Sequence, residues 1–548
     1  MVTIPENTDV LIVGAGPVGM TTAIMLAKHG IRGVIIDKAE EIFRQPRAIS
    51  LDNEALRILQ WAGVDDSDFK QVAIARVKFK SPIFGEIACA NSAGVIDCHP
   101  KLVTFYQPEL EAVLDKAVTK KGAFKLIRGL SLEHFTDDEQ GITATVKDSQ
   151  GQQHDIRCRF MVGADGANSQ IRKTLGLDFT RGRRYAEDWL IIDADNKDLS
   201  KRDYNLDYIE FLCDHKRTVP HMPAPNGKER WEFKLRANED PQDFLCDAKT
   251  QELLTPWFPN NDAQIERKAI YRFQAKTAPN FSKGNSFLVG DAAHVTPPFV
   301  GQGLVAGLRD AANLSWKLAA VLQKQADQKI LESYDQERRP HAKSMVRLAV
   351  MAGKIIMPKN FLAAALTHGT VSLLKHIPYL RNLLQELEIK PKNRFRKGLF
   401  MPRVSASKVD RGNHLPQTWL THRDGQKLRS DDLMKGQFQL IGVGYDPVEH
   451  LSKDAKQKWR AFGGEVLQLC HKSQQLNRID HEHCWEDEFG TIVPNFASIG
   501  RLIIVRPDQV VMTDGPLENA DSLVEEALSL LGYCGPEVIN RAILQQVS

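Results

Sequence analysis

The segment 9–37 constrains the fold more than any other part of the chain, because it has the pattern of a strand, a glycine turn, a helix and a second strand. The apolar run 10–13 is typical of a buried parallel strand, and Gly14, Gly16 and Gly19 follow it in the G-x-G-x-x-G spacing. Free N–H groups at the start of such a helix, together with the helix dipole, bind phosphate. The segment therefore predicts a dinucleotide-binding unit.

Each glycine of this motif has a separate task. Gly14 permits the tight turn, Gly16 lets the backbone approach a pyrophosphate, and Gly19 lets the helix expected over 17–28 pack closely on the strand. Asp37 ends the second strand, where its carboxylate can accept hydrogen bonds from the vicinal hydroxyls of an adenosine ribose and disfavours a 2′-phosphate. This unit alone is compatible with either NAD or FAD.

Length, charge and cysteine usage limit the remaining possibilities. A chain of 548 residues is expected to form two or three domains, and a net charge of +3 creates no field that would steer nucleic acid. The eight cysteines have neither C-x-x-C nor metal-ligand spacing, so we expect buried thiols in the cytoplasm and no metal site. There is no signal segment at the start, and the apolar stretch 361–374 is interrupted by polar residues. We expect that stretch to be a core helix and the protein to have no membrane partner.

An arginine-rich loop follows the second strand. Arg44 and Arg47 in this loop can hold phosphate or a substrate carboxylate through bidentate bonds, or can be plain solvated charge. A helix is expected over 106–118, with Pro108 near its first turn. Gln107, just before that proline, is placed to face whatever the first helix binds.

A second motif, RFMVGADGANSQIR, occupies residues 159–172. An apolar strand runs into Asp165 and Gly166, and the loop with Ser169 is predicted to cap a helix. The segment 185–273 then alternates in the manner of strands. We expect a sheet inserted between two halves of a nucleotide-binding domain, where it would form a wall over a ligand cavity.

A third motif lies within NSFLVGDAAHVTPPFVGQGLVAGLRDAANLSWKLAAVL, residues 285–322. A strand ends at Gly290 and Asp291, a loop with prolines crosses to Gly301 and Gly303, and a long helix starts there. A second helix N-terminus is thereby aimed at the same site. Asp291 stands at the carboxyl end of a strand, where an open parallel sheet places ligand-binding residues.

Two later segments complete the pattern. The segment 331–346 carries Arg338, Arg339 and His341, which we interpret as a helix and its solvated end. Beyond it, the runs FQLIGVGY, GEVLQL and RLIIVRPDQVVM alternate with helical patterns and indicate a separate small α/β module.

The three motifs in this order resemble those of the single-component FAD-dependent aromatic hydroxylases, the para-hydroxybenzoate hydroxylase superfamily. The closest likeness is to the 3-(3-hydroxyphenyl)propionate hydroxylase branch. It extends through PRAISLDNEALRILQ, YQPELE, GADGANSQIR, GDAAHVTPPFVGQG, YDQERRPHAKSM and VRPDQVV, which covers nearly the whole chain. The resemblance implies bound FAD, NADH or NADPH as co-substrate, O2, and a small phenolic substrate.

The fold implied by the resemblance is α/β: a Rossmann-like FAD-binding domain, an inserted mainly antiparallel β-sheet substrate domain, and a C-terminal thioredoxin-like α/β domain. We place the first part of the FAD-binding domain at 1–184, with substrate-domain strands near 72–105. The substrate-binding sheet follows at 185–273, the second FAD-binding part with a helical extension at 274–400, and the C-terminal domain at 401–548. Lacking C-x-x-C, that last domain is expected to serve packing and homodimer formation rather than redox chemistry.

The resemblance also assigns cofactor contacts by position. Arg47 and Gln107 fall where the family contacts the flavin phosphates and ribityl chain, Asp165 on the side where the nicotinamide approaches, and Asp291 at a ribityl hydroxyl, while 301–304 should lie along the pyrimidine end of the flavin. The full expected set is Gly14, Gly16, Pro17, Gly19, Asp37, Lys38, Arg44, Arg47, Gln107, Asp165, Asp291, Pro298, Gly301, Gly303, Leu304 and Val305.

One position departs from the family pattern. Relatives usually carry Asn where this chain has Val305, so any side-chain role of that Asn is absent. Backbone N–H groups and the helix dipole could still stabilise negative charge on the reduced flavin.

The implied reaction is aromatic hydroxylation: NAD(P)H reduces FAD, O2 adds at the flavin C4a, and the hydroperoxide delivers oxygen to the ring. The cofactor carries the chemistry, so no catalytic side chain is expected. The protein must hold the phenol close, favour the phenolate and exclude water. Pocket candidates, each also compatible with core packing, are His294, Pro297, Phe299, Tyr208, Trp231 and Phe233.

A substrate with an acidic tail would need a cationic partner in this pocket. Arg230 and Arg236 flank the expected strand 231–235, and side-chain alternation places both on one face. We expect one of them, in the first instance Arg236, to pair with the carboxylate.

Three alternatives remain at this point. An NAD-dependent dehydrogenase would explain the first motif but leaves the third without a use. A non-catalytic flavoprotein or assembly module is suggested by Val305 and the C-terminal domain. The hydroxylase could also act on a neutral phenol or a polyketide-like aromatic.

Overall fold

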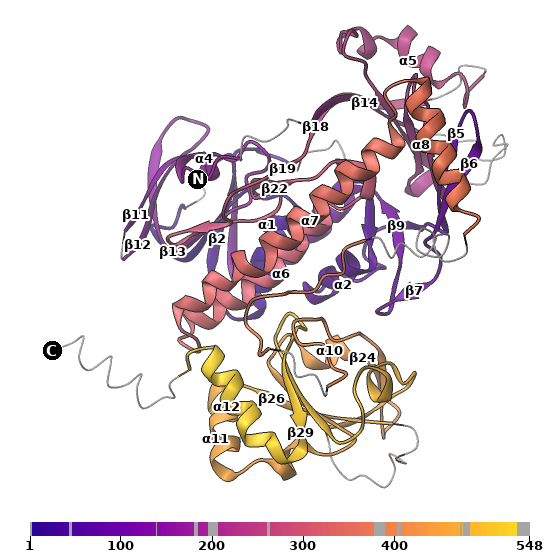
Figure 1. Cartoon of the computed structure of the whole chain (residues 1–548). Coiled ribbons are helices and arrows are strands. Elements are labelled where there is room, and N and C mark those ends of the chain that lie inside the picture. The colour runs from indigo at the N-terminus through magenta and orange to yellow at the C-terminus, as the bar shows by residue number, and fades with distance from the viewer. Residues whose placement is uncertain are drawn as a thin grey trace. The chain divides into compact units, whose positions relative to one another are not determined.

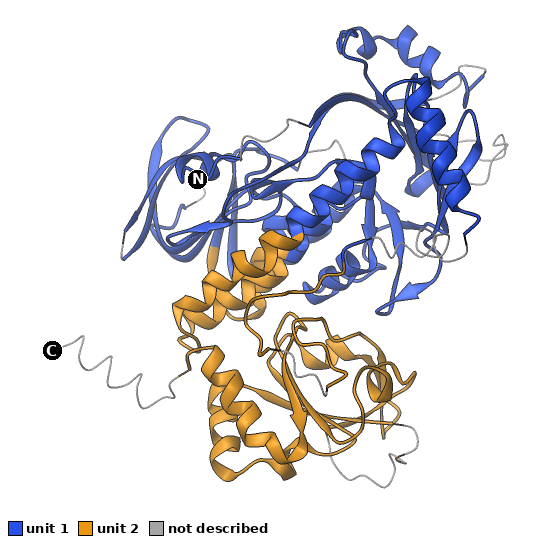
Figure 2. Cartoon of the chain, in the orientation of Figure 1, with its two compact units in different colours: residues 1–21, 34–309, 342–391 blue, residues 22–33, 310–341, 392–548 orange. Residues whose placement is uncertain are grey.

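The computed structural model divides the chain into two compact units (Figure 2). Helices α1 (Pro17–Lys28), α6 (Gly303–Leu322) and α7 (Glu332–Ile356) contribute residues to both, so neither unit is a continuous stretch of sequence. Unit 1 comprises residues 1–21, 34–309 and 342–391, and unit 2 comprises residues 22–33, 310–341 and 392–548. The structure describes residues 3–42, 47–138, 140–179, 185–195, 207–259, 264–377, 390–402, 407–471, 474 and 483–533.

The first sheet of unit 1 has eight strands and is built around the predicted first strand. Its strands are β1 (Asn7–Val13), β2 (Gly33–Asp37), β10 (Phe124–Arg128), β11 (Ser131–Asp138), β12 (Gly141–Lys147), β13 (Gln153–Gly163), β20 (Ser282–Lys283) and β21 (Ser286–Leu288). β1 lies between β2 and β13 and runs parallel to β13, which also pairs in parallel with β21. β12 and β11 continue the sheet in antiparallel pairs (Figure 1). The predicted strand, glycine turn and helix are confirmed.

The second sheet of unit 1 has seven strands in the order β18-β14-β17-β16-β15-β5-β6. Its strands are β5 (Arg76–Ser81), β6 (Gly85–Asn91), β14 (Ala186–Asp195), β15 (Tyr208–Leu212), β16 (Val219–Pro223), β17 (Lys228–Lys234) and β18 (Gln264–Gln274). Every neighbouring pair is antiparallel except β15 with β5. The mainly antiparallel inserted sheet expected from the sequence is therefore confirmed.

The two faces of this second sheet pack into different apolar clusters. On one face Trp231 and Phe233 lie with Phe244 near the helix α5 (Asp247–Leu254). On the other face Trp189 lies with Phe299 of the third motif. Because side chains alternate along a strand, this division decides which residues can approach a ligand held by the first sheet.

Further elements of unit 1 connect these sheets and cover them. They are β3 (Ser50–Asp52), α2 (Asn53–Trp61), β4 (Gln71–Ala73), β7 (Val95–Ile96), β8 (His99–Pro100), β9 (Leu102–Phe105), α3 (Gln107–Lys121), α4 (Gln170–Thr174), β19 (Lys276–Thr277), β22 (His294–Val295) and α8 (Phe361–Leu374). β3, β9 and β4 form a small three-stranded sheet.

Helix α8 corrects one prediction, because it is not a core helix. It packs on β6 through one side (Figure 1), where Ala364 and His368 are buried, and it leaves Leu362 and Leu366 about three-quarters exposed. His368 is held by Ser81 Oγ and Ile355 O, each at 3.0 Å. Among the described residues no single helix is long and apolar enough to cross a membrane, and one helix pair bent by 111° meets the length and composition requirement together.

The C-terminal part of unit 2 is a seven-stranded sheet with helices. Its elements are β23 (Trp419–His422), β24 (Lys427–Arg429), α10 (Ser430–Met434), β25 (Gln439–Val443), α11 (Lys453–Phe462), β26 (Glu465–Cys470), β27 (Cys484–Asp487), β28 (Arg501–Val505), β29 (Val511–Pro516) and α12 (Ala520–Leu530). β26 pairs in parallel with β25 after the α11 crossover, and β28 and β29 follow antiparallel before α12. This β–α–β and β–β–α order is that of the predicted thioredoxin-like fold.

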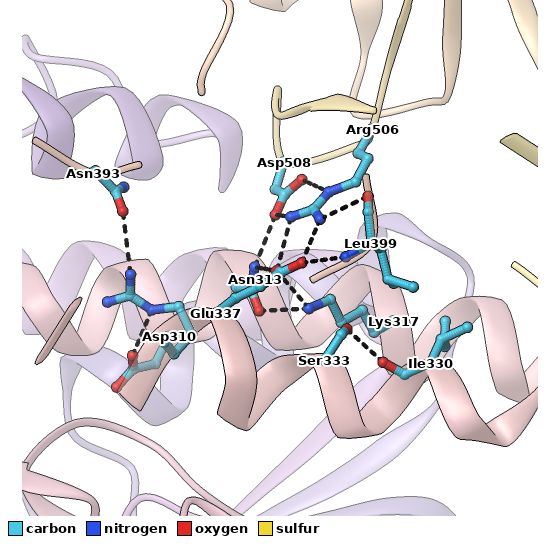
Figure 3. A network of polar contacts seen from close by, with 11 residues as sticks. Asp310, Asn313, Lys317, Ile330, Ser333, Glu337, Asn393, Leu399, Arg506 and Asp508 are labelled. Atoms are coloured by element: carbon cyan, nitrogen blue, oxygen red, sulfur yellow. Dashed lines mark hydrogen bonds and ion pairs between the residues drawn. The ribbon is translucent and has the colours of Figure 1, made fainter. Parts of the chain in front are cut away.

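A buried charge cluster joins α6 and α7 to the turn between β28 and β29, all within unit 2 (Figure 3). Glu337 is its centre: its carboxylate accepts from Lys317 Nζ at 2.8 Å, Arg506 Nη1 at 2.7 Å and Asn313 Nδ2 at 2.7 Å. Lys317, Glu337 and Arg506 have no exposed side-chain surface. Burial opposes the ionisation of Glu337, but Arg506 and Lys317 outweigh it and hold its pKa far below the ordinary value.

The basic cluster of α7 corrects a second prediction, because it is not a solvated helix end. Arg338 is fully buried and its Nε donates to Asp310 Oδ1 at 2.9 Å. Only Arg339 lies partly in solvent, paired with Asp335 one turn earlier. The sequence pattern shows the charges but not the facing acid on α6, so burial could not be foreseen.

We predict that Glu337→Gln destabilises the protein by roughly 3–5 kcal/mol, because the change leaves buried Lys317 and Arg506 without their shared counter-ion. Glu332→Gln, at the exposed first turn of α7, is the matched control and should cost under about 1 kcal/mol. Urea denaturation monitored by circular dichroism measures the stability of both variants.

Because the native pKa of Glu337 is depressed, its contribution to the free energy of unfolding is present above pH 4.5 and is lost as the pH falls below that value. Equal midpoints for the two variants would contradict the assignment.

Candidate active site

The glycine turn after β1 is closed on one side and open on the other. Gly14 has φ +110°, and a Cβ there would collide with the Ala164 carbonyl, while a Cβ on Gly19 would collide with the Gly14 carbonyl. A Cβ on Gly16 would meet nothing within 4 Å. The turn therefore packs tightly against the end of β13 and leaves the Gly16 side accessible, which fits a phosphate approached by the backbone.

The first and third motifs meet at the same place. Gly290 has φ +60°, and a Cβ there would lie 3.2 Å from Val18 in the first turn of α1. A Cβ on Gly307 of α6 would lie 2.6 Å from Val18 and 3.0 Å from the Gly290 Cα. The starts of α1 and α6 therefore converge on the ends of β1 and β21, as the sequence predicts. Glycine at positions 290 and 307 permits this close approach, because there is little room there for a side chain.

Asp37 lies at the end of β2 and fixes the turn from the other side. Its carboxylate accepts from Ala15 N at 2.7 Å and from Ala39 N at 2.8 Å. Each carboxylate oxygen has a further lone pair that a ribose hydroxyl can use. Pro17 is the first residue of α1, and Lys38 is exposed beside Asp37.

Gln107 holds the loop that contains Arg47. Its Oε1 accepts from Arg47 N at 3.0 Å and Ala48 N at 2.7 Å, and its Nε2 donates to Glu111 Oε1 at 2.6 Å. The side-chain oxygen is thus engaged by the backbone. Burial raises the pKa of Glu111, a residue the sequence analysis missed although its i, i+4 spacing to Gln107 on a helix was a usable signal. Arg44 lies outside the described residues.

The second motif supports the third. Asp165 Oδ2 accepts from Gln170 N at 2.8 Å and Ser169 Oγ accepts from Arg172 N at 3.0 Å, so the predicted capping turn is confirmed. Arg172 Nη1 donates to Ala292 O at 2.8 Å, next to Asp291. The GADGANSQIR segment therefore positions the loop after β21.

The Asp291 side chain is accessible to solvent although much of it is surrounded by protein. Its side chain has accessible surface, yet the surrounding protein raises the pKa of its carboxyl, an effect that His294 and Arg47 partly offset. Among the described residues the carboxyl has no hydrogen-bond partner. An acceptor of this kind at a strand end fits a cofactor hydroxyl.

The loop Gly301-Gln302-Gly303 contacts residues that the sequence analysis did not select. Gly301 has φ +61°, and a Cβ there would lie 2.6 Å from Ser50 Oγ. Gln302 Nε2 donates to Asp52 Oδ2 at 2.9 Å, and Gln302 Oε1 accepts from Arg309 Nη1 at 2.9 Å. Burial opposes the ionisation of Asp52, but Lys390 and Arg309 keep its pKa below the ordinary value. Asp52 caps α2, which local sequence could suggest, whereas its distant partners could not be read from the sequence.

At the start of α6 there is free space beside Gly303, whereas Val305, two residues later, is buried. A Cβ on Gly303 would meet nothing within 4 Å, Leu304 is half-buried, and Val305 is fully buried. The Val305 side chain therefore packs into the protein, and a negative charge outside this helix start would be stabilised by backbone N–H groups.

Three pocket candidates, His294, Pro297 and Phe299, belong to this segment of the third motif. Phe299 is buried with its ring 5.8 Å from Trp189, and the His294 ring lies 5.5 Å from Phe281. Pro297 is buried and Pro298 is half-buried in the same loop. The fourth candidate, Tyr208 on β15, is corrected: Ile209 and Phe211 lie in the cluster of Phe299, so Tyr208 points to the other face of the sheet, where Lys78 Nζ lies 3.7 Å above its ring.

Two further candidates lie on the wrong face of the second sheet. Trp231 is fully buried, stacked on His221 at 4.7 Å, and Phe233 is in the same cluster. Both point away from Phe299, since β17 alternates and the residues on the face of Trp189 and Phe299 are Arg230 and Glu232. Their aromatic character correctly indicated that they are buried, but it did not show on which face of the sheet they lie.

The prediction for Arg236 is also corrected. β17 ends at Lys234, so the assumed alternation does not extend to residue 236. Arg236 is exposed, and its Nε donates to Lys216 O at 2.9 Å. Arg230 is the arginine on the face shared with Trp189, and its Nη1 donates to Arg47 O at 3.0 Å.

Arg230 belongs to a buried polar group on this face. Asp193 Oδ1 accepts from Arg230 Nε at 2.6 Å, and Asp193 Oδ2 accepts from Arg267 Nη1 at 3.1 Å. Arg267 Nη2 also donates to the Tyr271 hydroxyl at 2.5 Å. Glu232 lies next to Arg230 on the same face and is 5% exposed. Arg230 and Arg267 thus share the carboxylate of Asp193, next to the apolar cluster of Trp189 and Phe299.

Comparison with known proteins agrees with this geometry. A family model described as FAD binding domain matches residues 7–349, and one described as HcaD C-terminal domain matches residues 412–529. The chain is 29% identical over 542 residues to the 3-(3-hydroxy-phenyl)propionate/3-hydroxycinnamic acid hydroxylase of Escherichia coli strain K12, covering 97% of this chain and 96% of that protein.

Solved structures share the whole fold. The flavin-dependent monooxygenase PieE, in complex with FAD and substrate, aligns with a TM-score of 0.82 at 20% identity, covering 96% of this chain and 99% of that chain. Aklavinone-11 hydroxylase, in complex with FAD and aklavinone, aligns with a TM-score of 0.74 at 22% identity, covering 97% and 100%.

The glycine turn, the convergent helix N-termini and the family match define an FAD-binding enzyme. Within that class, the chain belongs to the FAD-dependent aromatic hydroxylases of the para-hydroxybenzoate hydroxylase superfamily and is a flavoprotein monooxygenase. The dehydrogenase alternative is thereby excluded.

We predict that Asp291→Ala weakens FAD binding by about tenfold to a hundredfold while leaving the fold intact, because a hydrogen bond to a charged acceptor contributes about 1.5–3 kcal/mol. Titration of the apoprotein with FAD, followed by flavin fluorescence, measures the affinity. Asp138→Ala on exposed β11 is the control and should bind FAD normally. Unchanged affinity in Asp291→Ala would remove Asp291 from the cofactor site.

Proposed function

We propose that the protein hydroxylates a phenolic aromatic acid of the 3-(3-hydroxyphenyl)propionate type, with NADH or NADPH and O2 as co-substrates. The observation that carries this proposal is the face of the second sheet beside Phe299, where aromatic side chains adjoin the buried group of Asp193, Arg230 and Arg267. Full-length similarity to a hydroxylase of such acids supports the same substrate class.

In this proposal FAD, when bound, supplies the electron transfer and the oxygen activation. The N-terminus of α1 binds the pyrophosphate beside Gly16, and Asp291 accepts a hydrogen bond from a ribityl hydroxyl. The N-terminus of α6 at Gly303 stabilises negative charge on the ring system. Phe299 and Trp189 exclude water from the space above it.

The acidic tail of the substrate is assigned to the arginine pair rather than to Arg236. Arg230 and Arg267 both bond Asp193, and Glu232 is a second acid on the same face. The two guanidinium groups can donate hydrogen bonds to a substrate carboxylate, which needs such partners because an unpaired buried charge costs several kcal/mol.

We predict that purified holoenzyme consumes NADH faster when 3-(3-hydroxyphenyl)propionate is added and releases a dihydroxylated product. A neutral alkylphenol of the same length should be a weaker substrate, and a polyketide-like aromatic weaker still. NADH should be accepted at least as well as NADPH. Product analysis by mass spectrometry accompanies the oxidation assay. Absence of stimulation by every phenol would favour a non-hydroxylating flavoprotein, and a tenfold preference for NADPH would refute the co-substrate prediction.

We predict that Arg267→Gln raises KM for the acidic phenol by about tenfold or more relative to the neutral analogue, because the lost bond joins two charged groups. The ratio of the two KM values cancels any general loss of folded protein. Arg272→Gln is the matched control, since Arg272 is on the same strand but is 65% exposed. An unchanged ratio in Arg267→Gln would assign the tail to other residues.

A further inference from the structure

Glu232 is a buried carboxyl whose charged neighbours, Arg230 and Arg267, act on it without a hydrogen bond among the described residues. It is 5% exposed, and among the described residues no hydrogen bond or ion pair satisfies it. Its neighbours on β17, Glu229 and Arg230, are both engaged, by His221 at 2.7 Å and by Asp193 at 2.6 Å. A buried carboxyl without a hydrogen bond is costly, so a ligand that donates one to Glu232 would stabilise it.

The position of Glu232 on β17 puts it on the face of the second sheet that carries Trp189 and Phe299. On one side of it along β17, Arg230 reaches Arg47 O in the loop fixed by Gln107. On the other side, Lys234 lies opposite Trp189, whose ring contacts Phe299 beside the GQG loop. Glu232 lies between these two contacts on the same strand face.

The surroundings of Glu232 combine apolar residues with charged groups on both sides of it along β17. Across the sheet it faces Ile191, and the rest of the face belongs to the cluster of Phe299. Burial raises the pKa of Glu232 to about 7, with Asp193 acting in the same direction and Arg230 and Arg267 against it. The other charged groups on this face are engaged: Lys234 with Glu187, and Tyr271 with Arg267.

We propose that Glu232 binds the hydroxyl group of the phenolic substrate and accepts its proton before the ring is hydroxylated. This inference rests on the proposed function. The phenol O–H bond breaks, its electron pair stays on the phenolate oxygen, and the proton forms an O–H bond with the Glu232 carboxylate. Water returns the carboxyl to its ionised form after product release.

The electrostatics suit this transfer. A phenol has a pKa of about 10 and an ordinary glutamate about 4.3, a mismatch of roughly six pKa units, which the Glu232 environment reduces to about three. Arg230 next to the nascent phenolate lowers the mismatch further. A substrate carboxylate held by Arg267 would remove part of the positive field around Glu232 and make it a stronger base.

A competing explanation is that Glu232 serves only to balance the two arginines. That role requires its charge but no contact with a substrate, so it predicts the same loss with every phenol. Proton acceptance predicts a loss that depends on the acidity of the phenol, and this difference is measurable.

The test compares wild type, Glu232→Gln, Glu232→Asp and the control Glu229→Gln, all as FAD-loaded protein. Glu229 is a buried carboxyl on the same strand but on the opposite face. Two measurements are made over a pH series: binding of 3-(3-hydroxyphenyl)propionate from the perturbed flavin and phenol absorbance, and the single-turnover rate of hydroxylation. Ring-fluorinated analogues of the substrate supply phenols of lower pKa.

We expect Glu232→Gln to bind the substrate within about threefold of wild type but as the neutral phenol, and to hydroxylate it about a hundredfold more slowly or worse. Fluorinated phenols and alkaline pH should restore its rate much more than they raise the wild-type rate. Glu232→Asp should keep part of the activity with a shifted pH profile, and Glu229→Gln should behave as wild type.

Four results would overturn the inference. They are a Glu232→Gln enzyme with the wild-type pH profile, an equal loss with all phenols regardless of their acidity, equal losses in Glu229→Gln, and loss of folding in Glu232→Gln combined with a wild-type profile in Glu232→Asp. If wild type turns over phenols and Glu232→Gln matches it, only this inference fails. If wild type neither binds nor hydroxylates any phenol, the proposed function fails and this inference with it.

Discussion

The whole active-site architecture depends on a set of contacts that tolerate no side chain. Gly14 and Gly19 close the turn between β1 and α1 against Ala164, and Gly290 and Gly307 let the third motif approach Val18. The starts of α1 and α6 lie close together because these backbones approach one another, which is the arrangement that the proposed FAD site requires. The cost is conformational, since Gly14 and Gly290 have positive φ and an added Cβ has no space.

The parts of the fold that follow from local chemistry were predictable. The buried run of β1, the glycine spacing and the capping turn at Ser169 each have one structure that satisfies their backbone groups. The motif order then allowed the family fold to be expected, including the inserted sheet and the thioredoxin-like module. The position of Asp291 after a strand was also predictable, because the carboxyl end of a strand in a parallel sheet is a defined position, and its contact with the cofactor stays a prediction.

The errors share one cause, which is that sequence does not reveal what faces a residue. Trp231 and Phe233 were correctly taken as apolar and placed on the wrong side of the sheet. Arg338 was taken as solvated because its partner Asp310 is on another helix. Helix α8 has enough apolar residues for a core helix, yet it is covered on one side only. Glu232 carries no local signal at all, since its significance lies in the absence of a hydrogen bond among the described residues.

The cluster around Glu337 has a consequence for how such proteins can diverge. Arg506 belongs to the C-terminal module, while Glu337 and Lys317 belong to helices that precede it in sequence (Figure 3). A genetic exchange that replaced only the C-terminal segment would bury Arg506 without its counter-ion, or bury Glu337 without Arg506. The module is therefore bound to its helices by charge, and we expect residues 317, 337 and 506 to change together among relatives that retain the fold.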